Sequence, residues 1–193
     1  MEHIISKEHE VYEIYKNAGL SDEIATKVIK SSKSILRIRY QDPEFPTLHI
    51  TENGNWIDLK CAEDYTIRQG ESLKINLGVA MKLPAGCEAH LVPRSGTFDK
   101  YGLIQTNGTG IIDNSYSGTN DIWKMPVYAT RDTVVHKGDR LCQFRLFKTM
   151  EEELFGNNLP NDWFSSFGAS KLMILEMTTL DDVDRGGFGS TGL

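Results

Sequence analysis

A long alternating pattern between residues 72 and 91 constrains the fold of this chain more than any other feature. Every second position from Leu73 to Leu83 is apolar, and Cys87, Ala89 and Leu91 continue the same phase after a short turn. Side chains two positions apart point to the same face of an extended chain, whereas a helix repeats about every 3.6 residues. The pattern therefore predicts strands with one buried face and a core built from β-sheet.

Shorter stretches repeat the same period on both sides of this segment. Residues 35–40 and 142–146 also alternate between apolar and polar positions, and residues 84–86 and 136–139 have the composition of turns. Short strands separated by turns are typical of a β-barrel or β-sandwich. We therefore expect an all-β domain over residues 34–184.

Two segments depart from this rhythm. In residues 1–33, apolar residues recur at helical spacing around a stop at Gly19 and an N-cap at Ser21, which predicts a short α-helical N-terminal extension with two helices over 6–33. Both helices carry acidic residues, so packing or contact with a protein partner is favoured over DNA contact. Residues 150–170 predict a long insertion or lid-like loop, which is a second candidate surface for a protein partner.

Composition excludes several classes of function. A net charge of −6 and a pI near 5.4 argue against nucleic-acid binding, which needs a basic face. No apolar stretch approaches the roughly 20 residues of a membrane span, so no membrane contact is expected. Cys61, Cys87 and Cys142 are widely spaced and form no CxxC pair, which predicts reduced thiols that fill the core of a cytoplasmic protein.

Three polar stretches exceed what strands and turns require. The first, residues 93–96, places Arg94, Ser95 and Gly96 directly after an apolar strand. The guanidinium of arginine is a rigid fork of donors suited to phosphate oxygens, and a serine hydroxyl and a glycine amide add neutral donors. The alternative is a plain β-turn with a surface arginine.

The second stretch, residues 107–118, contains two glycines that allow a tight hairpin. Ile111 and Ile112 are expected to return to the core, so that Asp113 and Tyr116 project from the hairpin. A carboxylate fixed by such a scaffold can act as a general base. The alternative is an Asp–Asn turn that only joins two strands.

The third stretch, residues 137–144, begins with a Gly–Asp turn. Asp139 and Arg140 are candidates for bracing a neighbouring loop. Gln143 faces opposite Cys142 and Phe144, so its amide is a candidate phosphate ligand.

Taken in order, these stretches closely resemble the motifs of trimeric deoxyuridine triphosphatases (dUTPases). Residues 56–66 resemble the first motif and residues 185–193 the last, so the resemblance covers about 56–193 apart from 150–170. It implies a jelly-roll-type β-barrel of the dUTPase-like β-clip class and a homotrimer with shared active sites. The implied reaction is hydrolysis of dUTP to dUMP and pyrophosphate with Mg²⁺.

The resemblance also implies individual roles. Asp113 would direct and deprotonate the water that attacks the α-phosphorus, and Tyr116 would pack on the deoxyribose. Asp58 would hold the metal through a coordinated water. Residues 185–193 would form a flexible tail that closes over the active site. The implied substrate-binding residues are Arg94, Ser95, Gly96, Asn107, Gly110, Ile112, Tyr116, Gln143, Arg185, Phe188, Gly189, Ser190 and Thr191.

The chain departs from the family pattern at defined places. Only Gly186 and Gly187 separate Arg185 from Phe188, where the family commonly has two more residues. After Tyr116 the family usually shows a polar residue, glycine and glutamate, whereas this chain has Ser-Gly-Thr-Asn over 117–120. Two other functions stay open: a deoxycytidine triphosphate deaminase of the same fold, and a nucleotide-binding regulatory or interaction protein.

Overall fold

The structure is a computed structural model that describes residues 4–7, 12–13, 16–17, 19, 21–22, 35–50, 55–150 and 173–187. Strands dominate these residues, which confirms the all-β prediction. The elements are β1 (Ile4–Lys7), β2 (Ile35–Tyr40), β3 (Leu48–Ile50), β4 (Ile57–Lys60), β5 (Tyr65–Ile67), β6 (Ser72–Asn76), β7 (Val79–Lys82), β8 (Cys87–Pro93), α3 (Thr97–Tyr101), β9 (Leu103–Gln105), β10 (Gly110–Ile112), β11 (Lys124–Ala129), β12 (Thr133–Val135), β13 (Arg140–Lys148) and β14 (Met173–Glu176).

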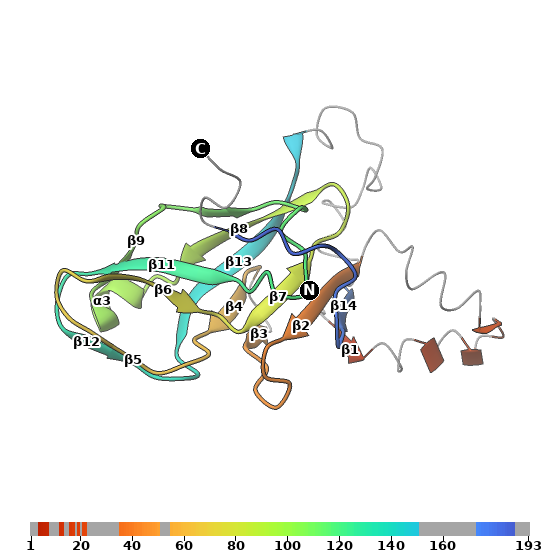
Figure 1. Cartoon of the computed structure of the whole chain (residues 1–193), viewed down its shortest axis with the longest axis horizontal. Helices are drawn as coiled ribbons and strands as arrows, with labels where there is room; N and C mark the ends of the chain where they lie inside the picture. Colours follow the sequence, from red (N-terminus) through yellow and green to blue (C-terminus); the bar gives the residue numbers. More distant parts are fainter. Residues whose placement is uncertain are drawn as a thin grey trace.

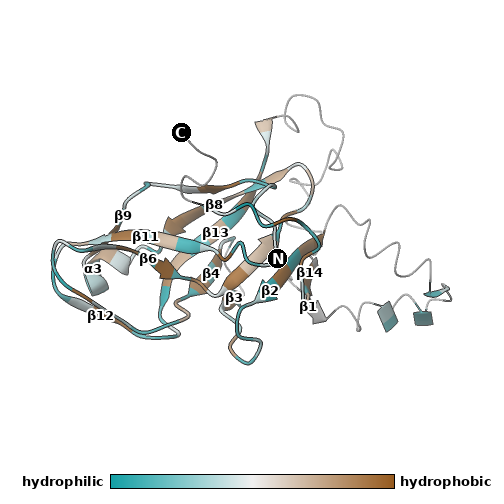
Figure 2. Cartoon of the chain, in the orientation of Figure 1, coloured by the Kyte–Doolittle hydropathy of each residue, from teal (hydrophilic) through white to brown (hydrophobic). Residues whose placement is uncertain are grey.

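The strands form four hydrogen-bonded sheets (Figure 1). Most of the buried apolar residues belong to one large cluster, and Ile35 and Leu175 form a second, small one. The largest sheet has the order β10-β8-β13-β4-β3, and a second has the order β1-β14-β2-β7. Two smaller sheets, β6-β11-β9 and β12-β5, complete the set. Figure 2 shows hydrophobic residues gathered on strands such as β2 and β8, while the connecting loops are mainly hydrophilic.

The long alternating pattern contains two strands that lie in different sheets. β6 pairs with β11, whereas β7 pairs with β2. The chain changes sheet at Leu77 and Gly78, and Gly78 has a φ of +64° that favours glycine. A Cβ on Gly78 would lie 2.8 Å from the Cβ of Ala62, so this crossing also needs the space that glycine leaves. The apolar alternation continues through the turn because the apolar side chains of β6 and of β7 both face the core.

A bulge explains the burial of two consecutive residues at the start of β13. The pairing of β13 with β4 shifts register between Arg140 and Cys142. Leu141 and Cys142 are therefore both fully buried, and the alternation then continues through Phe144. The ring of Phe144 packs edge-on against Trp123, with 5.2 Å between centroids.

All three cysteines are free and buried, which confirms that they fill the core. Burial is the largest cause that raises the pKa of Cys61, to about 11. Burial raises the pKa of Cys142 as well.

The N-terminal segment differs from the prediction. Residues 4–7 form β1, which pairs in parallel with β14, so the helix expected from residue 6 is wrong at positions 6 and 7. A strand is favoured there because it adds main-chain hydrogen bonds to an exposed sheet edge. Helical residues occur at 12–13 and 16–17, and Gly19 has a φ of +85°. Most of the predicted helical extension and nearly all of 150–170 lie outside the described residues.

No helix within the described ranges is both long enough and apolar enough to span a membrane.

Candidate active site

Asp58 is a buried carboxylate held between two arginines. It lies on β4 with an exposure of 4%. Nε of Arg94 lies 3.1 Å from one carboxylate oxygen, and a guanidinium nitrogen of Arg140 donates to the other at 3.2 Å. A buried charge is costly unless it is paired and hydrogen-bonded, and the two guanidinium groups supply that pairing. Arg140 therefore braces strand β4 through Asp58.

The register of the largest sheet places further polar residues beside Asp58. Asp58 is opposite Gln143 on β13 and opposite His49 on β3. Residues directly opposite in antiparallel strands share a face, so the three side chains form a row. Burial, with help from the charge of Arg140, lowers the pKa of His49 below its usual value, so this ring is neutral at pH 7. Gln143 was predicted from the sequence as a phosphate ligand, whereas His49 was not predicted.

The 93–96 turn is anchored to β13. The amide of Arg94 donates to the Leu141 carbonyl at 3.0 Å, and the Thr97 hydroxyl donates to the same carbonyl at 2.5 Å. Ser95 and Gly96 are exposed at the tip of this turn. The predicted donors Arg94, Ser95 and Gly96 are thus presented at the end of β8, next to the row that contains Asp58 and Gln143.

The loop between β9 and β10, two strands that belong to different sheets, is held from inside by Gln105. Its buried side-chain nitrogen lies 3.0 Å from the Leu91 carbonyl and 3.0 Å from the side-chain oxygen of Asn107. The same nitrogen lies 3.1 Å from the Gly108 carbonyl. Asn107 is exposed at the turn, and Gly110 packs on Leu91, where an added Cβ would lie 3.3 Å away. Gln105 was not predicted from the sequence, because the position of a glutamine in the chain does not show which groups its side chain contacts.

Two expectations for this stretch were wrong. Residues 103–112 do not form the predicted hairpin, because β9 pairs with β11 and β10 pairs with β8. Ile112 packs against the core as predicted, but Ile111 is 57% exposed. The two residues are neighbours on a strand, so their side chains point to opposite faces and only one of them can enter the core of this chain.

Asp113 follows β10 with a half-exposed carboxylate. One oxygen accepts hydrogen bonds from the amide of Ser115 at 2.8 Å and from the Ser115 hydroxyl. A guanidinium nitrogen of Arg185 lies 2.8 Å from both carboxylate oxygens. Partial burial opposes ionisation, but the bonds from Ser115 and Arg185 outweigh it and hold the pKa of Asp113 below its usual value. The carboxylate is therefore ionised at neutral pH.

Tyr116 is fixed beside Asp113 at both ends of its side chain. Its hydroxyl donates to the Ile122 carbonyl at 2.9 Å, and its ring packs against the core. Burial is the largest cause that raises the pKa of this phenol to about 12, so it stays protonated. A Cβ on Gly187 would lie 3.2 Å from the ring, which places the start of the tail against Tyr116.

Within one chain these residues form two separate groups. β10 pairs with β8 so that Ile112 is opposite Ala89, which places Asp113 near the first residues of β8. Arg94 follows the other end of that strand. Six residues of strand separate the two ends, a distance of about 20 Å. The Asp113–Tyr116 group and the Arg94–Gln143 group therefore lie near opposite ends of β8 within a single chain.

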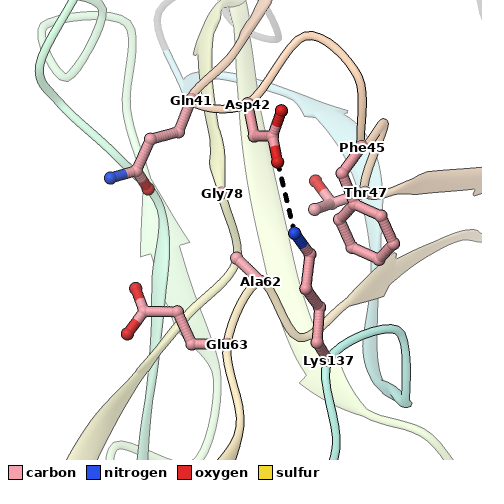
Figure 3. Close-up of a pocket in the computed structure, with 8 residues that line it drawn as sticks. All are labelled: Gln41, Asp42, Phe45, Thr47, Ala62, Glu63, Gly78 and Lys137. Carbon is pink, nitrogen blue, oxygen red and sulfur yellow. Dashed lines mark hydrogen bonds and ion pairs between the residues drawn. The ribbon is translucent and has the colours of Figure 1, made fainter.

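A cavity of about 190 Å³ opens beside the β2–β3 loop (Figure 3). The ammonium of Lys137 lies 3.2 Å from an Asp42 oxygen and 4.2 Å from the centroid of the Phe45 ring. The cavity shares no residue with the two groups above. Its lining residues are Gln41, Asp42, Phe45, Thr47, Ala62, Glu63, Gly78 and Lys137.

Comparison with known proteins gives the family. The dUTPase family model matches residues 51–161, more than half of the chain. The chain is also 45% identical over 157 residues to the SPbeta prophage-derived deoxyuridine 5'-triphosphate nucleotidohydrolase YosS of Bacillus subtilis, covering 81% of this chain and 97% of that protein.

The chain belongs to the dUTPase family. A deoxyuridine 5'-triphosphate nucleotidohydrolase of Bifidobacterium longum is 31% identical over 69% of this chain and 89% of its own length. The crystal structure of dUTPase from Streptococcus mutans superposes with a TM-score of 0.52 at 22% identity, covering 58% of this chain and 95% of that one. The dUTPase from phage phi11 of S. aureus gives 0.53 at 19% identity, covering 65% and 97%. These two structures support the fold.

The tail of this dUTPase family member is described only at its start. Phe188, Gly189, Ser190 and Thr191 lie outside the described residues, so their predicted roles stay predictions. Arg185 lies at Asp113 of its own chain. Asp121 was not predicted from the sequence. Its buried carboxylate accepts hydrogen bonds from the amides of Arg185 and Gly186. An aspartate in a polar loop gives no signal of such a role until its partners are known.

Proposed function

We propose that this chain hydrolyses dUTP to dUMP and pyrophosphate by attack of water on the α-phosphorus. Membership of the dUTPase family supports the substrate. The observation that carries the proposal is the ionised carboxylate of Asp113, fixed by Ser115 and Arg185 directly after β10. A fixed, ionised carboxylate can both orient a water molecule and take its proton.

The loop between β9 and β10 would determine which nucleoside is bound. The exposed amide of Asn107 and the backbone from Gly110 to Ile112 offer donors and acceptors for the edge of uracil, and Gln105 holds their positions. A buried donor left unpaired discriminates more strongly than the contact of one methyl group. The immobile ring of Tyr116 would lie against the deoxyribose and leave no room for a 2′-hydroxyl.

The triphosphate would lie along the end of β8 and the adjacent row on β4 and β13. Arg94 supplies charge and Ser95 and Gly96 supply neutral donors there, and Gln143 is beside Asp58 in register. The predicted tail ligands, Arg185, Phe188, Gly189, Ser190 and Thr191, would close over the bound nucleotide.

Magnesium fits this donor set as an ion that arrives with the nucleotide. Within the described ranges no group of three or more His, Cys, Asp or Glu side chains could hold a metal. Mg²⁺ keeps several waters and binds chiefly through phosphate oxygens, so one carboxylate acting through a water suffices. Asp58 is that carboxylate in our proposal. When bound, Mg²⁺ neutralises phosphate charge.

A homotrimer with shared active sites would bring the two separated groups together. Asp113 and Arg94 lie at opposite ends of β8, so a complete site needs Asp113 of one chain and Arg94 of another. Exposed apolar residues are available for such contacts, since Ile104 and Tyr128 are paired in register and both exposed. We place this jelly-roll trimer in the cytoplasm, with residues 1–33 and 150–170 as candidate surfaces for a protein partner.

Pyrophosphate release tests the function directly. The purified chain with Mg²⁺ is mixed separately with dUTP, dCTP, dTTP and UTP, and release is expected from dUTP alone. Asp113→Asn should abolish it while the circular dichroism spectrum stays unchanged. Ammonia from dCTP would identify a deaminase instead, and a folded oligomer that turns over none of the four would favour a regulatory protein.

Mixed trimers test whether the site is shared. Asp113→Asn and Arg94→Gln should each be inactive alone. After co-refolding in equal amounts, sites that combine an intact Asp113 with an intact Arg94 of a neighbour should restore about a quarter of wild-type activity. No restoration would contradict a site built from two chains.

A further inference from the structure

The segment that precedes the tail, residues 180–187, is bound along the loop after Tyr116. We call it the C-terminal strap. The Thr119 hydroxyl donates to the Leu180 carbonyl at 2.7 Å and accepts from the Leu180 amide at 2.9 Å. The Ser117 hydroxyl donates to Asp182 at 2.8 Å. The strap is therefore attached to its own chain over several consecutive residues.

Asp121 fixes the strap where it reaches the candidate site. Its carboxylate is 1% exposed and accepts hydrogen bonds from the amide of Arg185 at 2.9 Å and from the amide of Gly186 at 2.8 Å. A third amide, that of Gly118, donates to the same carboxylate at 2.9 Å. A buried carboxylate with three amide donors is a rigid anchor. It holds the backbone of Arg185 in place and so limits where the guanidinium can reach.

The guanidinium of Arg185 lies on the carboxylate of Asp113. One of its nitrogens is 2.8 Å from both carboxylate oxygens and also contacts the Ser115 hydroxyl. Ser115 itself donates to Asp113. The carboxylate of Asp113 is thus held by Ser115, from the turn that follows β10, and by Arg185, from the C-terminal strap.

We infer that Arg185 is a positioning residue for Asp113 of the same chain, with Asp121 as its anchor. The inference rests on the proposed function, because it assigns a role in that reaction. Arg185 fixes the rotamer of the carboxylate that would aim the water. The substrate-binding role predicted for Arg185 places the same side chain on the nucleotide, so the two roles differ in what they do to the kinetics.

Loss of a phosphate ligand weakens substrate binding and raises KM, whereas loss of a positioning residue lowers kcat. Arg185→Gln is expected to lower kcat for dUTP about 10²-fold, the effect typical of a small misplacement of a catalytic group. KM should change little, and Arg185→Lys should recover part of kcat. Asp121→Asn should lower kcat in the same way, although Asp121 contacts Arg185 only through the backbone amide. Asp181→Asn, an exposed carboxylate of the same strap, is the matched control and should behave as wild type.

A titration provides a readout that does not depend on turnover. The ¹³C signal of the Asp113 carboxyl is followed against pH in the substrate-free protein, in wild type and in Arg185→Gln. Arg185 is the cation on this carboxylate, while the loop and the strap also carry the carboxylates of Asp121, Asp181, Asp182 and Asp184. Removal of the cation should therefore move the Asp113 titration to higher pH, and the acidic limb of kcat/KM should move with it.

Mixed trimers separate a same-chain role from a role at a neighbouring site. Asp113→Asn combined with Arg185→Gln should restore no activity, because no chain then carries both residues. Restored activity, or a higher KM at unchanged kcat in Arg185→Gln, would overturn the inference. If the wild type releases no pyrophosphate from dUTP, the proposed function fails, but the titration still decides whether Arg185 acts on Asp113.

Discussion

Replacing Gly118 with alanine should detach the C-terminal strap from the chain that carries it. A Cβ at this position would lie 2.5 Å from the Cα of Asp184 and 2.6 Å from its amide nitrogen. Carbon atoms in contact are normally about 3.5 Å apart, so the strap backbone must move by about 1 Å. The neighbouring amide of Arg185 lies 2.9 Å from Asp121, so such a movement breaks that hydrogen bond.

The expected effect follows from the two amides that Asp121 would lose. Hydrogen bonds to charged groups contribute about 1.5–3 kcal/mol each, so loss of the bonds from Arg185 and Gly186 destabilises the docked strap by about 3 kcal/mol at the lower bound. This change increases the population of the open strap about 10²-fold. The core strands do not depend on these bonds, so the opening is local and the melting temperature should change little.

Trypsin provides the assay, because it cleaves after Arg185. When opening is fast relative to cleavage, the cleavage rate follows the open population. Loss of residues 186–193, followed by mass spectrometry, should therefore accelerate about 10²-fold in Gly118→Ala. Gly96→Ala is the control, since Gly96 has a φ of −89° and a Cβ there meets nothing within 4 Å. Equal cleavage rates in Gly118→Ala and wild type would refute the reasoning about the strap.

Three further predictions concern the rest of the chain. Phe144→Ala should lower the free energy of unfolding by about 3–5 kcal/mol, measured by urea denaturation, because Phe144 is fully buried against Trp123. Partial burial opposes ionisation of Asp182, but its bonds, first that from Lys82, hold its pKa below the usual value. Because the pKa of Asp182 is depressed, its ionised form stabilises the folded chain at pH values above about 3.9, the pKa in the unfolded chain, and this stability is lost as pH falls through the folded-state pKa. Asp182→Asn should therefore reduce the difference in urea midpoint between pH 7 and pH 3. A thiol reagent should leave the native cysteines unmodified at pH 8 and label all three in urea, because burial raises the pKa of the thiols of Cys61 and Cys142; labelling of the folded chain would contradict this.

The core was predictable where one local rule decided it. The alternation over Cys142, Phe144 and Leu146 depends only on the period of a strand, and these residues are buried as expected. The sheet change at Gly78 was not predictable, because β6 and β7 bury the same phase and the period continues through the turn. The strand at residues 4–7 was not predictable either, since its hydrogen-bonding partner is β14, about 170 residues away in the sequence.

The candidate site shows the same division. Asp113 and Tyr116 could be selected from the sequence because they follow a glycine-rich turn, and Arg94 and Gln143 because they follow or occupy apolar strands. That the two pairs lie at opposite ends of β8 depends on which strands pair, and that information is not local. Asp121 could not be selected either, because its partners are backbone amides far along the chain.

Two segments that depart from the family pattern lie close together in the structure. One is the short spacing between Arg185 and Phe188, and the other is the Ser-Gly-Thr-Asn sequence after Tyr116. That second sequence is the surface on which the strap is bound: Thr119, which stands where the family commonly has glutamate, bonds to both backbone groups of Leu180. An ionised glutamate there could not donate to the Leu180 carbonyl as the Thr119 hydroxyl does, and it would add negative charge to a loop that already carries Asp121.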